Sequence, residues 1–236
     1  MDSMEVLGIV PARGGSKSIP RKNIAMLNGK PLISYTIEAA LSCKSISRLI
    51  VSTDDKEIAD ISMALGAEVP FMRPKELARD STPTIDAVLH ALDELECNSG
   101  YCPDIVVLLQ ATCPLRSADD IDEAVSTFLS SRGDVVVSVV RSEEHPYNMF
   151  KVEGAYLHPL IDERDVSVTR RQDYPEFYRL NGAVYVSTPR TLRRFRSFMK
   201  GKLVPYIMPW ARSIDIDYPL DMEYALFLLK KFEEAN

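Results

Sequence analysis

Short runs of β-branched and other apolar residues alternate with longer segments of helical periodicity along most of this chain of 236 residues. We expect strands at residues 6–10, 49–51, 67–71, 105–109 and 135–140, and helices at residues 31–41, 56–65, 84–95 and 119–129. The expected strands are apolar almost throughout, which indicates burial on both faces. The pattern therefore predicts an α/β fold with a mostly parallel, Rossmann-like sheet flanked by helices.

The same alternation predicts where a ligand would bind. In parallel sheets covered on both faces, the ligand crevice lies at the carboxyl ends of the strands, where loops lead into helices. We therefore expect the polar loops after Val10, Val51 and Leu109 to line one common site.

The alternating pattern weakens over about residues 141–179, where Pro, Tyr and Arg are frequent. It resumes with expected strands at residues 182–186, 202–208 and 212–217 and a final helix at residues 220–233. We interpret residues 1–236 as a single domain with an insertion at about residues 141–179. The insertion is either a surface excursion or a subdomain that packs on a second copy of the protein.

Charge and composition exclude several classes of protein. The 28 basic and 34 acidic residues give a net charge of −6, which argues against a broad nucleic-acid-binding face. No apolar run approaches the ~20 residues that span a bilayer, and the acidic start of the chain does not resemble a signal peptide. The four cysteines form no CxxC pair and are expected to be reduced thiols. We therefore expect a cytoplasmic protein.

A loop rich in glycine and cations follows the first expected strand directly. It spans residues 11–23, PARGGSKSIPRKN, and its cations are Arg13, Lys17, Arg21 and Lys22. The adjacent Gly14 and Gly15 lack a Cβ, so backbone N–H groups there can approach phosphate oxygens. The loop fits neither the Walker A nor the GxGxxG pattern. It suits a triphosphate, which carries about four negative charges, although a solvated loop with incidental charge is a competing interpretation.

Two aspartates near the end of the chain form a second pattern. Asp215 and Asp217 alternate with Ile214 and Ile216 in an extended segment, so both carboxylates are expected to face the same side. Adjacent like charges are costly without a cation between them, and hard oxygen ligands suit Mg²⁺. Alternatively, Asp217 caps the helix that starts near Pro219. The pair is also similar to the DxD motif of nucleotide-sugar glycosyltransferases, which keeps that class as a rival.

These motifs and several others resemble the acylneuraminate cytidylyltransferases, the CMP-sialic acid synthetase family. The matching blocks are PARGGSKSIPRKN, NGKPL at 28–32, VSTD at 51–54, RP at 73–74, LQATCPLR at 109–116, RQ at 171–172, YRLNGA at 178–183 and SIDID at 213–217. They follow the family's order over nearly the whole chain. The resemblance implies a nucleotidyltransferase (GT-A-like) fold and Mg²⁺-dependent transfer of CMP from CTP to the anomeric hydroxyl of a nine-carbon sugar acid, foremost N-acetylneuraminate.

The resemblance also implies roles for single residues. Nucleotide binding is implied for Ala12, Arg13, Gly14, Gly15, Ser16, Lys22, Asn23, Arg73 and Thr84, and sugar binding for Gln110, Arg171, Arg179, Asn181 and Tyr185. The implied catalytic residues are Arg13 and Lys22, which would stabilise the departing pyrophosphate, and Asp215 and Asp217, which would hold the metal.

For the nucleotide, the resemblance places Asn23 at the ribose, Arg73 at the O2 and N3 acceptors of cytosine, and Thr84 at its amino group. Family members form homodimers, and Arg171 is expected to reach the neighbouring subunit's site from the insertion. Without the resemblance, Arg73 would be interpreted as a surface ion-pair partner, and Arg170 with Arg171 as a solvated charge pair.

Two positions depart from the family pattern. Ser18 stands where many relatives have Gly, at a cost of about 1 kcal/mol if that residue needs a positive φ. Asn148 lies where some relatives have a sugar-binding Lys, so legionaminic and pseudaminic acids are alternative substrates. Enzymes for 3-deoxy-octulosonic acid lack the Arg-Gln…Tyr-Arg-x-Asn-Gly block, which disfavours that sugar. Two other kinds of protein are retained as alternatives: a glycosyltransferase and a non-catalytic CTP-binding regulator.

Overall fold

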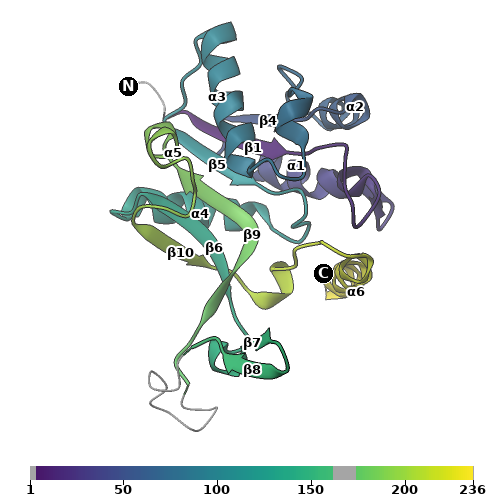
Figure 1. The fold of residues 1–236 in the computed structure, drawn as a ribbon. Coiled ribbons are helices and arrows are strands. Elements are labelled where there is room, and N and C mark those ends of the chain that lie inside the picture. The colour runs from purple at the N-terminus through teal and green to yellow at the C-terminus, as the bar shows by residue number, and fades with distance from the viewer. Residues whose placement is uncertain (1–3, 162–173, 236) are drawn as a thin grey trace.

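The protein is described by a computed structural model that covers residues 4–161 and 174–235 of the chain. In this part, six strands form the central sheet in the order β10-β6-β9-β5-β1-β4 (Figure 1). The bounds are β1 Val6–Pro11, β4 Arg48–Ser52, β5 Ile105–Leu109, β6 Val135–Arg141, β9 Tyr178–Ser187 and β10 Leu203–Ile207. All neighbouring strands in this sheet run parallel except β9, which is antiparallel to β5 and to β6. The predicted mostly parallel sheet is confirmed.

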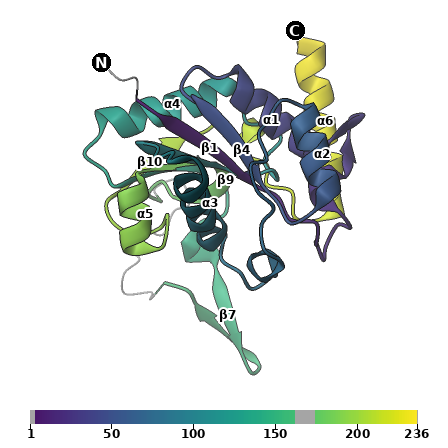
Figure 2. The same cartoon turned by 90° about the horizontal axis from the view of Figure 1, so that it is seen from above.

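Helices cover both faces of this sheet (Figures 1 and 2). One hydrophobic cluster joins the sheet to α1 Leu32–Ser42, α2 Lys56–Ala64 and α4 Ala118–Ser130, and a second joins it to α3 Thr84–Ser99 and α5 Pro189–Phe195. The last helix, α6 Pro219–Ala235, packs instead on the loop after β1 and the start of α1. None of the described helices is long and apolar enough to cross a membrane.

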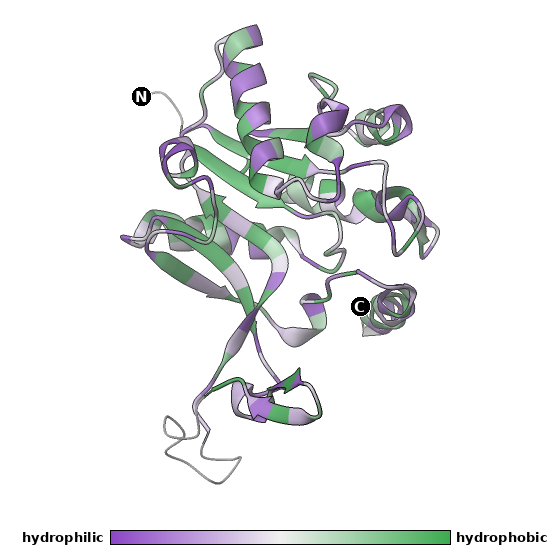
Figure 3. Ribbon diagram, viewed as in Figure 1, coloured by the Kyte–Doolittle hydropathy of each residue, from purple (hydrophilic) through white to green (hydrophobic). Residues whose placement is uncertain are grey.

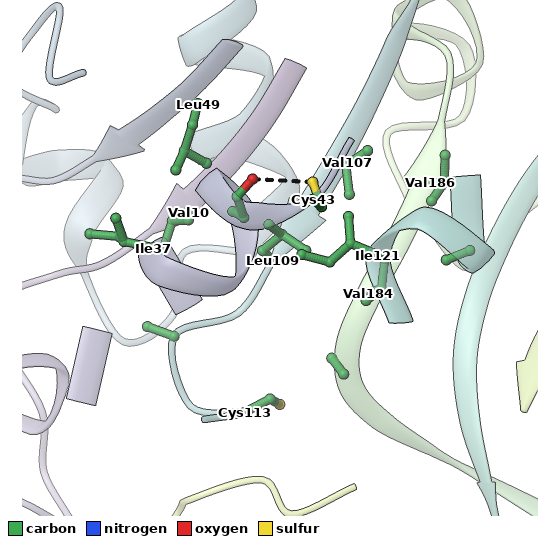
Figure 4. Packing of buried hydrophobic residues seen from close by; sticks show 14 of the residues in the cluster. Val10, Ile37, Cys43, Leu49, Val107, Leu109, Cys113, Ile121, Val184 and Val186 are labelled. Atoms are coloured by element: carbon green, nitrogen blue, oxygen red, sulfur yellow. Dashed lines mark hydrogen bonds between the residues drawn. The ribbon is translucent and has the colours of Figure 1, made fainter. Parts of the chain in front are cut away.

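The strands are apolar on both faces because successive side chains enter different clusters. Along β1, Val10 packs toward α1 and α4, whereas Ile9 packs toward α3. Figure 4 shows the first cluster, to which Val10, Val107 and Ile121 belong. Each fully buried side chain of this size contributes roughly 1.5–3 kcal/mol of hydrophobic stabilisation. The core thus fixes the strand ends from which the polar loops extend.

Two of the expected strands are absent from the sheet. Residues 67–71 make only the isolated bridge of Glu68 with Ile50, and Met72 just after them bridges Thr53, because Pro70 lacks the N–H that a ladder needs. Residues 212–217 lie outside every described strand: Arg212 ends the 3-10 helix Trp210–Arg212, and the Ile216 N–H donates to the carbonyl of Thr112 (2.8 Å) in the loop after β5. This last segment therefore crosses the carboxyl end of the sheet.

The sequence also failed to indicate α5 and two hairpins. One hairpin, β2 Met26–Leu27 with β3 Lys30–Pro31, precedes α1. The other, β7 Phe150–Glu153 with β8 Tyr156–Pro159, lies apart from the sheet within the expected insertion (Figure 1). Apolar residues occur in this second hairpin (Figure 3), and Val152 and Tyr156 are 73% and 74% exposed.

Candidate active site

A pocket of about 570 Å³ lies at the carboxyl ends of β1 and β5. Four segments far apart in sequence form its wall: the loop after β1, residues 73–87, the loop after β5, and the segment before α6. The predicted site residues that line it are Arg13, Gly15, Ser16, Lys22, Asn23, Arg73, Thr84, Gln110, Asp215 and Asp217. The fold thus brings the cation-rich loop and the aspartate pair, about 200 residues apart, into one cavity.

The loop after β4 does not line the pocket but supports the loop that does. The Gly14 N–H donates to the Asp54 carboxylate (3.1 Å) instead of facing the pocket. A Cβ added at Gly14 would lie 2.5 Å from a carboxylate oxygen of Asp55, so this close approach requires glycine. Gly15 lines the pocket, and a Cβ added there would have nothing within 4 Å. Ala12 is buried behind the pocket, where its N–H bonds to β4.

The left-handed residue of the cation-rich loop is Arg21, with φ 52° and ψ 39°. Ser18 does not have a positive φ, so the strain considered for that position does not arise. The Arg21 guanidinium lies 3.0 Å from Asp55 and 2.9 Å from Glu57, at the start of α2. Arg21 therefore anchors the loop to α2, outside the pocket wall.

The two cations with implied catalytic roles are each held by a carboxylate at the pocket. The Arg13 guanidinium lies 2.5 Å from Asp80. The Lys22 ammonium lies 2.9 Å from Asp217 and donates to the carbonyl of Ile216 (2.7 Å). Only 14% of the Lys22 side chain is exposed, so this residue is held in place between the loop and the aspartate segment. Asn23 stabilises the turn by donating to the carbonyl of Arg13 (2.9 Å).

Arg73 is a buried residue of the pocket wall and not a surface ion-pair partner. Its side chain is 5% exposed, and its nearest carboxylate, that of Asp54, lies 3.9 Å away. Burial lowers the pKa of the Arg73 guanidinium, an effect that Asp54 opposes. The Arg73 Nε has no hydrogen-bond partner among the described residues. A buried planar donor with unused capacity suits a neutral heterocycle with adjacent acceptors. Thr84 lines the same pocket at the first residue of α3.

The two aspartates point into the pocket, while Ile214 and Ile216 are buried in the cluster with α6, as their alternation predicted. Burial raises the pKa of Asp215; the nearby charge of Asp217 adds to this, and Lys22 opposes it. The Asp217 carboxylate accepts from Lys22 (2.9 Å), and Asp221 in the first turn of α6 accepts the N–H groups of residues 217 and 218. The described residues contain no cluster of three or more metal-ligating side chains. This wall therefore offers two carboxylates.

Buried polar contacts hold the aspartate segment against the sheet. Arg212 makes two 2.9 Å contacts with Asp120, a carboxylate with no exposed surface. Burial pushes the pKa of Asp120 upward, but Arg212 and Ser117 more than offset this and hold it below its usual value. Asn181 is also buried, and its amide donates to the hydroxyl of Ser213 (2.9 Å). These contacts fix the backbone immediately before Asp215.

The predicted sugar-binding residues are not gathered in this pocket. Gln110 lines it, whereas Asn181 lies behind it in the contacts just described. Tyr185 is 7% exposed in the core, where burial raises its pKa to about 12. Arg179 is exposed near the start of β9, away from the pocket wall. Arg171 lies outside the described residues.

Several pocket residues had no motif to indicate them. They are Leu77, Arg79, Asp80 and Thr82. Their signal in the sequence is position alone, because residues 75–83 connect Arg73 to Thr84.

The cytidylyltransferase family model matches residues 7–233, nearly the whole chain. The chain belongs to the cytidylyltransferase family. It is therefore a nucleotidyltransferase, and the glycosyltransferase alternative raised by the Asp-Ile-Asp motif gains no support. The family membership predicted from the sequence motifs is confirmed.

Curated relatives of this cytidylyltransferase act on several sugars, according to their names. It is 33% identical over 234 residues to CMP-N,N'-diacetyllegionaminic acid synthase of Legionella pneumophila, covering 98% of this chain and 99% of that protein. It is 33% identical over 232 residues to the pseudaminic acid cytidylyltransferase of Campylobacter jejuni, with 98% and 99% covered. It is 33% identical over 228 residues to the N-acylneuraminate cytidylyltransferase of Escherichia coli, covering 96% of this chain and 52% of that longer protein.

A solved structure supports the fold. A CMP:2-keto-3-deoxy-manno-octonic acid synthetase complexed with CTP superposes with a TM-score of 0.70 at 17% identity, covering 96% of this chain and 99% of that one. At this identity the similarity concerns the fold alone, and it confirms the expected nucleotidyltransferase architecture.

Proposed function

We propose that this protein transfers CMP from CTP to the anomeric hydroxyl of a nonulosonic acid, foremost N-acetylneuraminate, and releases pyrophosphate. One observation carries the proposal: a single pocket unites the cation-rich loop, the buried Arg73 and the pair Asp215 and Asp217. A cytidylyltransferase needs cations for a triphosphate, donors for a cytosine and oxygen ligands for a metal, and this pocket offers all three. Relatives named for legionaminic and pseudaminic acid are as similar as the neuraminate enzyme, so both sugars are alternative substrates.

In this proposal the nucleotide lies along the wall from Arg73 to the loop after β1. Arg73 and Thr84 bind the cytosine, since the unpartnered Nε of Arg73 is buried at that end. Asn23 binds the ribose, and the phosphates lie against Gly15, Ser16 and the loop cations. Rigid donors that need no rearrangement contribute most to stabilising a developing charge, and Lys22 is already immobilised by two contacts.

The aspartate pair fits a divalent cation, for which we propose Mg²⁺. Asp215 is partly buried beside a second carboxylate, and its raised pKa reflects the cost of keeping that charge. A bound cation would relieve this cost, and the lack of a third ligating side chain in the described residues leaves room for phosphate oxygens and water, as Mg²⁺ prefers. When bound, the ion would polarise the α-phosphate and favour loss of the attacking hydroxyl's proton.

The chain's own residues then perform the remaining tasks. Gln110 orients the sugar at the end of β5, so that its anomeric oxygen can form a bond to the α-phosphorus. The bond from that phosphorus to the bridging oxygen breaks in line, and pyrophosphate carries away the electron pair. Arg13 and Lys22 neutralise the charge that develops on this leaving group.

We further propose that the protein is a cytoplasmic homodimer in which the insertion of a partner subunit completes the sugar subsite. Among the described residues of one chain, only Gln110 of the predicted sugar-binding set lines the pocket. The hairpin β7–β8 projects from the body with apolar side chains exposed, and Leu157 is 65% exposed. An exposed apolar patch on an excursion of this kind is typical of an interface. Arg171 and Arg179, which belong to the insertion, are the proposed contributors.

The test is pyrophosphate release with CTP and Mg²⁺, offering N-acetylneuraminate, legionaminate and pseudaminate in turn. We expect release that depends on both CTP and one of the sugars, with little release from UTP. The absence of release with every sugar, from a protein that binds CTP, would contradict the proposed reaction. Release with an analogue but not with N-acetylneuraminate would retain the reaction and replace the sugar.

A further inference from the structure

Asp80 occupies an unusual position in the pocket wall. One of its carboxylate oxygens lies 2.5 Å from the Arg13 guanidinium, and the other lies 2.8 Å from the Lys17 ammonium. A second link joins the same two segments, because Arg13 also donates to the carbonyl of Ala78 (3.4 Å). Lys17, and then Arg13, hold the pKa of Asp80 below its usual value, so it is a carboxylate at neutral pH. One acidic side chain thus engages two cations of the cation-rich loop.

These ion pairs can be exchanged for another anion. The side chains of Arg13, Asp80 and Lys17 are 33%, 41% and 84% exposed, and all three line the pocket. Exposed ion pairs are weak, whereas a polyphosphate carries more charge and more acceptor oxygens than one carboxylate. Asp80 and the β- and γ-phosphates would therefore compete for the same donors.

A second acidic contact on the loop provides an internal comparison. Glu57 also pairs with a loop cation, at 2.9 Å from Arg21. It is also exposed and carries the same charge, but neither Glu57 nor Arg21 lines the pocket. Asp80 pairs with cations that line the pocket, whereas Glu57 pairs with a cation that does not. Comparing variants of the two residues therefore distinguishes competition for phosphate-binding cations from a general effect of removing a negative charge.

We infer that Asp80 is a positioning residue that acts through Arg13 and Lys17 as a displaceable counter-anion, holding both cations between turnovers and weakening the binding of pyrophosphate. This inference rests on the proposed function, because it assumes that the loop binds phosphates. The arriving triphosphate displaces the carboxylate from the cations. After pyrophosphate has formed, the carboxylate competes for them again and favours release. No covalent step is involved.

The test is calorimetric binding of inorganic pyrophosphate, CTP and CMP to the full chain at constant Mg²⁺. Asp80→Asn keeps the shape of the side chain and removes its charge. We expect it to tighten pyrophosphate and CTP binding about two- to thirtyfold, the range for losing two exposed ion pairs. CMP lacks the β- and γ-phosphates, so its affinity should change less than about twofold. The KM for CTP should fall in the same variant.

Control variants make the result specific. Glu57→Gln should leave pyrophosphate affinity within about twofold, since its cation faces away from the pocket. Asp80→Glu should restore affinity toward the parent value. In a Lys17→Met background the tightening caused by Asp80→Asn should shrink, because half of the competition is already gone.

A residue with only a structural role would loosen ligand binding when changed, so the sign of the effect decides. Unchanged or weaker pyrophosphate binding in a folded Asp80→Asn protein would overturn the counter-anion role, and tight CTP binding by the parent would leave the proposed function standing. If the parent bound neither CTP nor pyrophosphate, both the proposed function and this inference would fail.

Discussion

Replacing Arg212 with Met tests whether the buried contact with Asp120 holds the segment that carries the aspartate pair. Asp120 has no exposed surface, and both of its oxygens lie 2.9 Å from the guanidinium. Removing one partner of a fully buried pair costs about 3–5 kcal/mol. The Arg212 side chain is 35% exposed and Asp120 keeps its contacts with Tyr206 and Ser117, so we expect a loss of about 2–3 kcal/mol at pH 7.

The loss should also depend on pH in a defined direction. In the folded parent, the pKa of Asp120 lies below its value in the unfolded chain, which is about 3.9. The ion pair therefore stabilises the fold fully at pH values above the unfolded pKa, and this stabilisation is lost as pH falls through the folded pKa. In the variant, burial without Arg212 raises the pKa of Asp120, so its charge is costly near neutral pH. The difference in stability between parent and variant should therefore shrink as pH is lowered from 7 toward about 4.

The assay is urea unfolding of parent, Arg212→Met and Arg212→Lys at several pH values, with turnover measured alongside. We expect Arg212→Lys to fall between the other two, because a lysine keeps the charge but not the paired contacts. We also expect kcat/KM of Arg212→Met to fall about tenfold, since small displacements of positioned groups are costly. A loss of stability below about 0.5 kcal/mol, or one that did not vary with pH, would refute this reasoning.

Three further predictions concern the pocket itself. Asp217→Ala should abolish turnover without unfolding the protein, as measured by pyrophosphate release and circular dichroism; full activity would refute the metal assignment. Gly14→Ala should lower the melting temperature and raise the KM for CTP, because its Cβ would lie 2.5 Å from Asp55, whereas Gly15→Ala should preserve the melting temperature. Arg73→Lys should weaken CTP binding about tenfold or more by calorimetry, because a lysine cannot supply a planar fork of donors; unaltered affinity would remove Arg73 from the cytosine site.

Much of the fold follows from local pattern. Apolar runs bounded by loops placed all six strands of the sheet, and helical periodicity with capping residues placed α1 to α4 and α6 to within a few residues. The errors have physical causes. Residues 67–71 are apolar except for Glu68, but Pro70 prevents a full ladder. Residues 214–217 alternate like a strand because Ile214 and Ile216 face a core and the two aspartates face the pocket, although no described strand pairs with them.

The candidate site was predictable where chemistry is concentrated in a motif. The cation-rich loop and the aspartate pair were both found, and the structure brings them together. Contacts between distant residues were not predictable, since nothing in the sequence matches Gly14 with Asp54 or Arg13 with Asp80. The two roles of the glycines are likewise visible only in three dimensions, because Gly14 permits a close approach and Gly15 faces the cavity.

The central claim is that the α-phosphorus of CTP is transferred intact to a sugar acid. Phosphorus NMR of a reaction with CTP, Mg²⁺ and the sugar that supports release tests it most directly. We predict that the three CTP resonances are replaced by one CMP-sugar phosphodiester and by pyrophosphate, in equal amounts. Formation of CMP or CDP without a phosphodiester, or consumption of CTP that does not depend on the sugar, would contradict the account.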